Sequence, residues 1–175
     1  MQSSTPSLYK VLVATAPAVG KPLYYINLAR QVQTGARCMG SKVGAVLVRD
    51  DRVISTGYNG TPENARNCDE GGCYRCANRT EFNSGTGLDR CICVHAEQNA
   101  FLSAARFGIV VAGSELFTTS QPCFNCLKEA TQLKLNRIYF DQVYPVAGFE
   151  QKYLADQYEH LVDLLPDHGM FKLIP

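Results

Sequence analysis

The 175-residue sequence has no run of basic residues, no internal repeat and no low-complexity segment. Its net charge is only +1, so we expect no basic surface that would recruit a nucleic-acid backbone. No apolar stretch approaches the ~20 residues that a membrane-spanning helix needs. The apolar run at 11–19 is short, is interrupted by Pro17 and follows a single basic residue, Lys10, which is a poor match to a secretion signal. We therefore expect neither a nucleic-acid partner nor a membrane segment.

What the chain does contain is typical of one globular domain. Apolar residues make up 46% of the sequence and charged residues 19%, a balance that excludes intrinsic disorder. We expect a single domain over residues 22–175. The first 21 residues show no clear periodicity, and a tail, a short strand and an oligomer contact all remain open for them.

Periodicity and turn residues predict the order of helices and strands. Helices are expected at 22–33, 95–107, 123–135 and 148–164. Strands are expected at 43–48, 52–56, 115–119, 137–140 and 169–174. The first two strands form a hairpin, and later strands are joined by helices, which makes those strands parallel. The sequence thus predicts an α/β fold with a five-stranded mixed sheet.

Two short motifs carry the chemistry. His95 and Glu97 begin one predicted helix, and Cys123 and Cys126 begin another, with a predicted strand between the motifs. Cysteines at i and i+3 share a helix face, and the positive end of the helix favours thiolate over thiol. Three N and S ligands leave one tetrahedral position of a zinc ion open, and Glu97 then has a proton to move. Alone, the Cys123–Cys126 pair also fits a redox pair or a structural zinc knuckle, and His95 alone also fits a core histidine. Together the two motifs predict a catalytic zinc site.

A connection without periodicity, residues 63–94, holds most of the other thiols. A loop of this length within a compact domain needs some other source of order. A closed structural zinc site would supply it, and Cys38 is placed to join that site. Six thiols exceed the four ligands of one tetrahedral ion, so two ions, spare sulfurs and metal-free thiols all remain open. The thiols concerned are Cys38, Cys68, Cys73, Cys76, Cys91 and Cys93.

The high cysteine content also bears on location. A secreted chain with eight cysteines would suggest disulfides, but here two of them belong with His95. Metal-bound thiolates fit a reducing compartment better, so we expect the protein to be cytoplasmic.

The loop Gly57-Tyr58-Asn59-Gly60-Thr61-Pro62 has two interpretations. Glycine, asparagine and proline all serve turns, so the loop fits ordinary turn chemistry. It also fits a substrate loop in which the Asn59 amide bonds a sugar hydroxyl. The sequence leaves both interpretations open.

At these residues the chain resembles the deoxycytidylate (dCMP) deaminases of the cytidine deaminase-like fold. The resemblance runs from about Pro22 to Tyr144 and is strongest to the cysteine-rich fungal and plant-type branch. It rests on Cys38 before Val43-Gly44-Ala45-Val46, the 57–62 loop, Asn67-Cys68, Gly71-Gly72-Cys73-Tyr74-Arg75-Cys76, Cys91-Ile92-Cys93-Val94-His95-Ala96-Glu97 and Pro122-Cys123-Phe124-Asn125-Cys126.

The resemblance implies a three-layer fold with helices on both faces of the sheet. It implies a catalytic zinc ion on His95, Cys123 and Cys126, with Glu97 moving protons. The implied reaction is hydrolytic deamination of dCMP to dUMP and ammonia, which supplies dUMP for thymidylate synthesis. It also implies a homo-oligomer, often a hexamer, that dCTP activates and dTTP inhibits.

The resemblance also suggests substrate contacts. Asn59 would bind the deoxyribose, and Lys42 the phosphate, where the family often carries two arginines and this chain has Ser41-Lys42. Further expected contacts, on the pyrimidine edge or near the nucleotide, are Ala96, Gln121, Arg106 and Tyr144.

Two other functions remain open. One is deamination of another cytosine nucleoside, nucleotide or base. The other is a non-catalytic zinc scaffold or regulatory partner, against which an intact Glu97 argues, because a structural site has no use for a carboxylate beside an open metal position.

Overall fold

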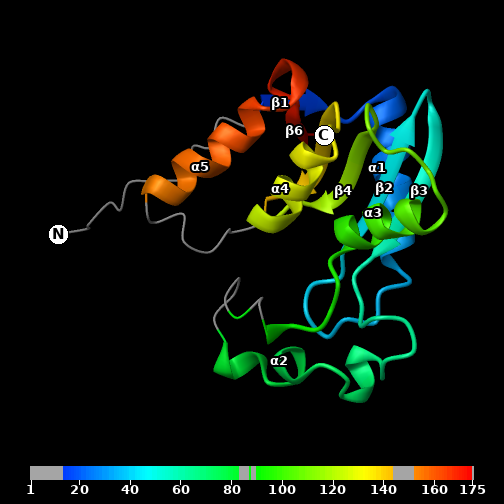
Figure 1. Ribbon diagram of the computed structural model, residues 1–175, viewed down its shortest axis with the longest axis vertical. Helices are drawn as coiled ribbons and strands as arrows, with labels where there is room; N and C mark the ends of the chain where they lie inside the picture. Colours follow the sequence, from blue (N-terminus) through cyan, green and yellow to red (C-terminus); the bar gives the residue numbers. More distant parts are fainter. Residues whose placement is uncertain (1–13, 83–86, 88–89, 144–151, 175) are drawn as a thin grey trace.

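The computed structural model describes residues 14–82, 87, 90–143 and 152–174 (Figure 1). Its strands are β1 (Ala14–Pro17), β2 (Gly44–Arg49), β3 (Arg52–Tyr58), β4 (Glu115–Ser120), β5 (Arg137–Gln142) and β6 (Met170–Ile174). Its helices are α1 (Gly20–Gln33), α2 (Tyr74–Ala77), α3 (Ala96–Arg106), α4 (Phe124–Gln132) and α5 (Lys152–Asp163), with short 3-10 turns η1 (Cys68–Glu70), η2 (Arg79–Glu81) and η4 (Pro166–His168). The predicted helices and strands are all present, with ends that differ by a few residues. The predicted start of the last helix, at Gly148, lies outside the described residues.

The strands form one mixed sheet in the order β1-β6-β5-β4-β2-β3. β4, β5, β6 and β1 run parallel, whereas β2 is antiparallel to both β3 and β4. This confirms the predicted mixed pairing. The sheet has six strands rather than the five predicted, because β1 adds an edge strand beside β6. β1 lies within the first 21 residues, and its four residues are too few to show an alternating pattern.

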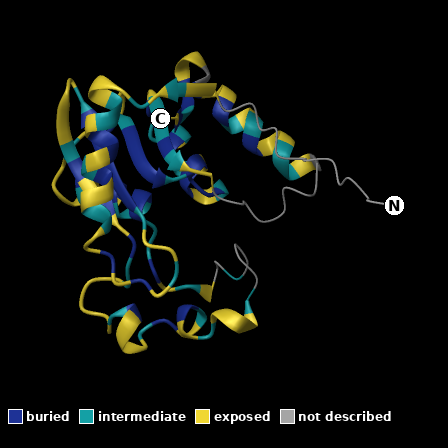
Figure 2. Ribbon diagram, turned by 180° about the vertical axis from the view of Figure 1, so that it is seen from behind, coloured by how far each residue is buried: buried dark blue, intermediate teal, exposed yellow. Residues whose placement is uncertain are grey.

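Helices cover both faces of the sheet, so the fold has the three layers that were expected. Side chains alternate along β2: Ala45 and Leu47 belong to the core on the α3 side of the sheet, and Val46 and Val48 belong to the core on the α1 side. Figure 2 shows the buried residues concentrated in the central strands. β2 is therefore buried on both faces, between α1 on one side and α3 on the other.

Two glycines allow helices to lie unusually close to the sheet. A Cβ added at Gly44 would lie 2.1 Å from the carbonyl oxygen of Ala29 in α1. A Cβ added at Gly57 would lie 2.2 Å from the carbonyl oxygen of Ala96 in α3. Only glycine fits such contacts without moving the helix. Gly57 therefore fixes the distance between β3 and the first turn of α3.

The cysteine-rich segment forms a separate lower part of the molecule around α2 (Figure 1). Its two ends meet, because Gly60 and Val94 exchange backbone hydrogen bonds of 3.2 and 2.8 Å. Helices are short in this segment, and its buried centre consists of cysteine side chains. Among the helices that the structure describes, none has the length and apolar character needed to cross a membrane.

Candidate active site

The N-termini of α3 and α4 meet beside the carboxyl end of β4. His95 immediately precedes α3, and Cys123 immediately precedes α4, each with extended backbone angles. Gln121 and Pro122 connect Cys123 to the last residue of β4. The turn from strand to helix thus delivers the cysteines to the histidine, although 28 residues separate His95 from Cys123.

The three predicted ligands of the catalytic metal lie together with spacing that suits zinc. The Nδ1 atom of His95 is 3.4 Å from the Sγ of Cys123 and 3.5 Å from the Sγ of Cys126, and the two sulfurs are 3.5 Å apart. Tetrahedral zinc with Zn–S of ~2.3 Å and Zn–N of ~2.0 Å places its ligands roughly 3.5–3.8 Å from one another. The residues present therefore fit a zinc ion held by one nitrogen and two sulfurs.

The local electrostatics favour the ligand form of Cys123. Contact with Cys126, and then with His95, lowers the pKa of the Cys123 thiol, so this group is readily a thiolate. The same contact with Cys123 raises the pKa of His95 to about 9. A metal ion that binds here therefore displaces a proton from the imidazole.

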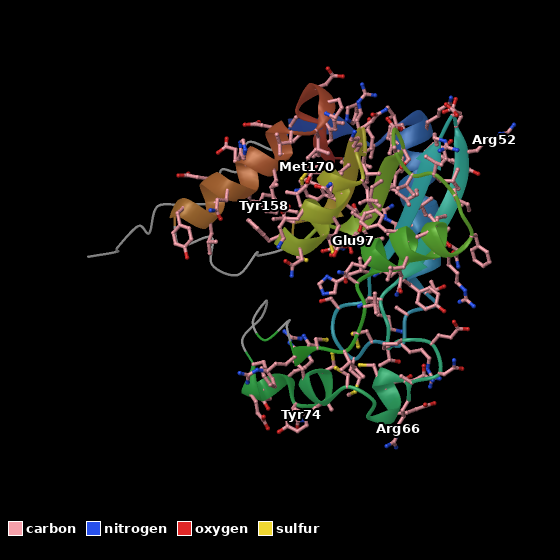
Figure 3. All side chains as sticks on the ribbon, in the orientation of Figure 1. Arg52, Arg66, Tyr74, Glu97, Tyr158 and Met170 are labelled. Carbon is pink, nitrogen blue, oxygen red and sulfur yellow. The ribbon has the colours of Figure 1, made fainter. Side chains whose placement is uncertain are left out.

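Glu97 lies beside these ligands and is almost fully buried (Figure 3). Burial raises the pKa of its carboxyl to about 7, against an opposing effect of His95. A carboxyl group with a pKa near neutrality both accepts and releases protons readily. The first turn of α3 thus presents a proton-transfer group next to a metal-ligand set.

Two interactions that the sequence did not reveal hold this arrangement. Gln98 accepts a hydrogen bond from the backbone N–H of His95 and donates one of 2.8 Å to Glu129 on α4, so it ties the two helix ends together. Tyr158 on α5 donates a hydrogen bond of 2.7 Å to the carbonyl oxygen of Pro122, in the turn before Cys123.

A cavity of about 410 Å³ opens onto His95 and Glu97. Asn59, Ala96 and Gln121, three of the predicted substrate contacts, line it. The cysteine-rich segment forms its other wall, and two arginines of that segment, Arg75 and Arg79, line the cavity as well. Neither arginine was predicted from the sequence as a substrate contact.

The other predicted substrate residues lie elsewhere. Lys42 is exposed and lines an adjoining depression with Arg30 and Asp141, not the cavity itself. Arg106 is exposed, forms an ion pair of 2.7 Å with Glu63 and is not among the residues that line the cavity. Tyr144 lies outside the described residues.

The remaining six cysteines are brought together, and they fall into two groups that overlap. Cys38 reaches the segment from the loop after α1, as the sequence analysis anticipated. All eight cysteines of the chain are free of disulfides.

Known proteins are similar to this chain in sequence and in fold. A family model described as the cytidine and deoxycytidylate deaminase zinc-binding region matches residues 21–142. The chain is 42% identical to a deoxycytidylate deaminase of Schizosaccharomyces pombe and 39% identical to one of Saccharomyces cerevisiae, each over 121 residues. These alignments cover 69% of this chain but only 37% of each relative, so the match spans little more than a third of the fungal proteins.

A shorter relative and a solved structure match over nearly their whole length. A deoxycytidylate deaminase of Mycobacterium phage D29 is 35% identical over 123 residues, which cover 67% of this chain and 91% of that protein. The crystal structure of dCMP deaminase from the cyanophage S-TIM5, in complex with dCMP and dUMP, superposes with a TM-score of 0.63 at 26% identity. That match covers 86% of this chain and 95% of the phage chain. The chain therefore belongs to the cytidine and deoxycytidylate deaminase family of zinc-binding proteins.

Proposed function

We propose that this chain catalyses the hydrolytic deamination of dCMP to dUMP and ammonia. One observation carries the proposal: the buried carboxyl group of Glu97 lies beside a His-Cys-Cys ligand set on the wall of a cavity large enough for a nucleotide. The fungal and phage relatives are named deoxycytidylate deaminases, and the cyanophage enzyme binds dCMP and dUMP. Both facts support dCMP as the substrate.

His95, Cys123 and Cys126 would hold the catalytic zinc. Zinc at such a site supplies an activated water near neutral pH. Glu97 would take a proton from the attacking water, deliver it to N3 of the cytosine and later protonate the departing amine. The water oxygen replaces the amino group at C4, one water proton stays on N3, and the second passes by way of Glu97 to the amine, which leaves as ammonia.

The cavity wall would orient the pyrimidine and the sugar. Ala96 and Gln121 line the cavity and would bind the pyrimidine edge. Asn59 accepts a hydrogen bond of 2.7 Å from Val43 N–H and donates one of 2.8 Å to the carbonyl of Ser41. Its amide thus shapes the loop before β2, and its second N–H would serve the deoxyribose. This combines both interpretations of the 57–62 loop.

For the phosphate, we propose Arg75 and Arg79 as the principal anchor. Both line the cavity, and a guanidinium binds phosphate through two parallel hydrogen bonds, which an ammonium group cannot do. Lys42, the residue expected from the sequence, stands in the adjoining depression. It would add long-range attraction but not a direct contact.

The proposal is tested with a substrate panel of dCMP, CMP, deoxycytidine and adenosine on the zinc-loaded protein. Arg79→Gln should raise KM for dCMP by roughly tenfold to a hundredfold, since a charge-assisted bond contributes ~1.5–3 kcal/mol. Deoxycytidine turnover should change little. Arg52→Gln is the matched control, because Arg52 lies at the far end of β3 from Glu97 (Figure 3). Lys42→Met should change KM for dCMP less than Arg79→Gln does.

The panel also separates the alternatives. A parent protein that prefers deoxycytidine is a nucleoside deaminase, and the dCMP assignment is then wrong. A preference for dCMP that survives Arg79→Gln and Arg75→Gln but falls with Lys42→Met returns the phosphate anchor to Lys42. Zinc binding without turnover of any substrate identifies a non-catalytic scaffold.

We also propose a homo-oligomer, often a hexamer in proteins of this kind, controlled by dCTP and dTTP. Exposed apolar side chains at Leu102 and Phe107 of α3 and its end support an assembly surface. Reduced thiols at all eight cysteines support a cytoplasmic location. Light scattering with and without each nucleotide tests the assembly and its effectors together.

A further inference from the structure

We propose that Cys38 and the five cysteines of the cysteine-rich segment bind two zinc ions in one binuclear cluster, with Cys76 and Cys93 bridging both metals. This goes beyond the proposed function and does not depend on the identity of the substrate. It assigns every thiol that the catalytic site leaves unused, and it gives the segment between β3 and α3 its source of order.

The two sets of ligands overlap. Within each of two groups of four cysteines, all sulfur atoms lie within 4.8 Å of one another. The first group is Cys38, Cys68, Cys76 and Cys93, and the second is Cys73, Cys76, Cys91 and Cys93. Cys76 and Cys93 belong to both groups. Each group therefore has the four ligands of a tetrahedral ion only if these two sulfurs are shared.

The sulfur spacing is that of metal-bound thiolates. Cys38 and Cys76 in the first group are 3.8 Å apart, and in the second group Cys91 lies 3.7 Å from both Cys73 and Cys76. The edge of a tetrahedron with Zn–S of ~2.3 Å is about 3.8 Å long. A disulfide would require a much shorter S–S distance of ~2.05 Å. Both groups thus keep the distance at which a metal, but not a covalent bond, joins them.

The surroundings also suit thiolates. The backbone N–H of Met39 donates to Cys68 Sγ, and that of Gly40 donates to Cys38 Sγ, both at 3.3 Å. Such donors orient metal-bound sulfurs and stabilise their charge. The sulfurs are also withdrawn from water, because Cys68, Cys73 and Cys76 are each at most 2% exposed.

A single zinc ion would leave two of the six thiols without a metal. An ion in the first group leaves Cys73 and Cys91 as unused thiols, and an ion in the second leaves Cys38 and Cys68. Cys73 is fully buried and Cys68 nearly so, although neither packs against the apolar core of the sheet. With two ions every sulfur has a metal, and six thiolates and two Zn²⁺ carry a net charge of −2. Arg75 and Arg79 lie on the same wall and complement that charge.

The position of the cluster connects it to catalysis. Cys38, Cys76, Cys91 and Cys93 line the same cavity as Glu97. Arg75 is the residue directly before a bridging cysteine, and Arg79 donates a hydrogen bond of 3.1 Å to the carbonyl of Met39, next to Cys38. The two metals would therefore hold the wall that carries the proposed phosphate anchor.

The first test is the metal content and spectrum of the parent protein, purified in zinc and dialysed against metal-free buffer. Elemental analysis should give about three zinc ions per chain, one catalytic and two in the cluster. X-ray absorption should show a zinc–zinc distance of about 3 Å, as two tetrahedra that share an edge require. After exchange with ¹¹³Cd, two cluster resonances should be coupled to each other through the shared sulfurs. About two zinc ions per chain, or two cluster resonances without coupling, would overturn the proposal.

Variants then locate the bridges. Cys73→Ser and Cys38→Ser should each lower the total by about one ion, because each removes a ligand of one metal only. Cys76→Ser should lower it by about two. Cys123→Ser is the matched control, since it should remove the catalytic ion alone and leave the ¹¹³Cd coupling intact. If Cys73→Ser or Cys38→Ser leaves the zinc content of a folded protein unchanged, a single-ion site replaces the cluster. If a variant does not fold, the zinc content, the zinc–zinc distance and the ¹¹³Cd coupling of the parent protein decide between the cluster and a single-ion site.

Discussion

Removing the hydroxyl group of Tyr158 tests how the second cysteine motif is held. Tyr158 is fully buried, donates a hydrogen bond of 2.7 Å to the Pro122 carbonyl, and lies 3.4 Å from the side-chain nitrogen of Gln121 (Figure 3). Tyr158→Phe keeps the ring and leaves both buried partners without this bond. An unsatisfied buried group costs ~1–3 kcal/mol, so the free energy of unfolding should fall by about that amount.

Loss of the Tyr158 hydrogen bond should also lower catalytic activity. The turn through Gln121 and Pro122 places Cys123, and a displacement of the turn misaligns both the metal ligand and the pyrimidine contact. We expect kcat/KM for dCMP to fall by roughly tenfold or more.

Urea unfolding in zinc-containing buffer and dCMP turnover measure the two effects. Tyr153→Phe is the matched control, because Tyr153 lies on the same helix with 59% of its surface exposed. It should change the unfolding free energy by less than ~0.5 kcal/mol. If Tyr158→Phe is as stable and as active as Tyr153→Phe, the hydroxyl does not support the site and this reasoning is wrong.

Two further predictions concern the first turn of α3. Gly57→Ala should lower the free energy of unfolding by ~1–3 kcal/mol, because the new Cβ meets the Ala96 carbonyl at 2.2 Å, whereas Gly60→Ala, with nothing within 4 Å, should cost less. Equal urea midpoints for the two variants would contradict this. Gln98→Ala should lower the unfolding free energy by ~1–2 kcal/mol and reduce kcat, since it breaks the bond of 2.8 Å to Glu129. An unchanged kcat for Gln98→Ala would show that catalysis does not depend on the hydrogen bond between Gln98 and Glu129.

The chemistry of the site could be predicted because its residues occur in short sequence motifs. His95 and Glu97 are two residues apart, and Cys123 and Cys126 are three apart, each pair at a helix start that proline or periodicity signals. The mixed sheet followed from the order of hairpin and helices. Sequence spacing was thus sufficient to predict those parts of the structure in which residues close in sequence are also close in space.

What the sequence left open involves contacts between distant parts of the chain. The role of residues 14–17 stayed undecided because the four residues of β1 pair with β6, at the other end of the sequence. Lys42 was expected at the phosphate from the family resemblance and stays an untested prediction, whereas Arg75 and Arg79 line the cavity only because their segment folds back over it. The overlap of the thiol groups at Cys76 and Cys93 is equally invisible in a one-dimensional spacing.

The most direct test of the central claim is the comparison of Glu97→Gln with the parent protein in dCMP turnover and zinc content. The parent should convert dCMP to dUMP, and the variant should keep its zinc content, because Glu97 is not one of the His95, Cys123 and Cys126 ligand set. The turnover number of Glu97→Gln should be lower than that of the parent by ~10²–10⁴-fold or more, since general acid–base catalysis usually contributes a factor of this size. A variant that keeps both its zinc and a rate comparable to that of the parent would contradict the account.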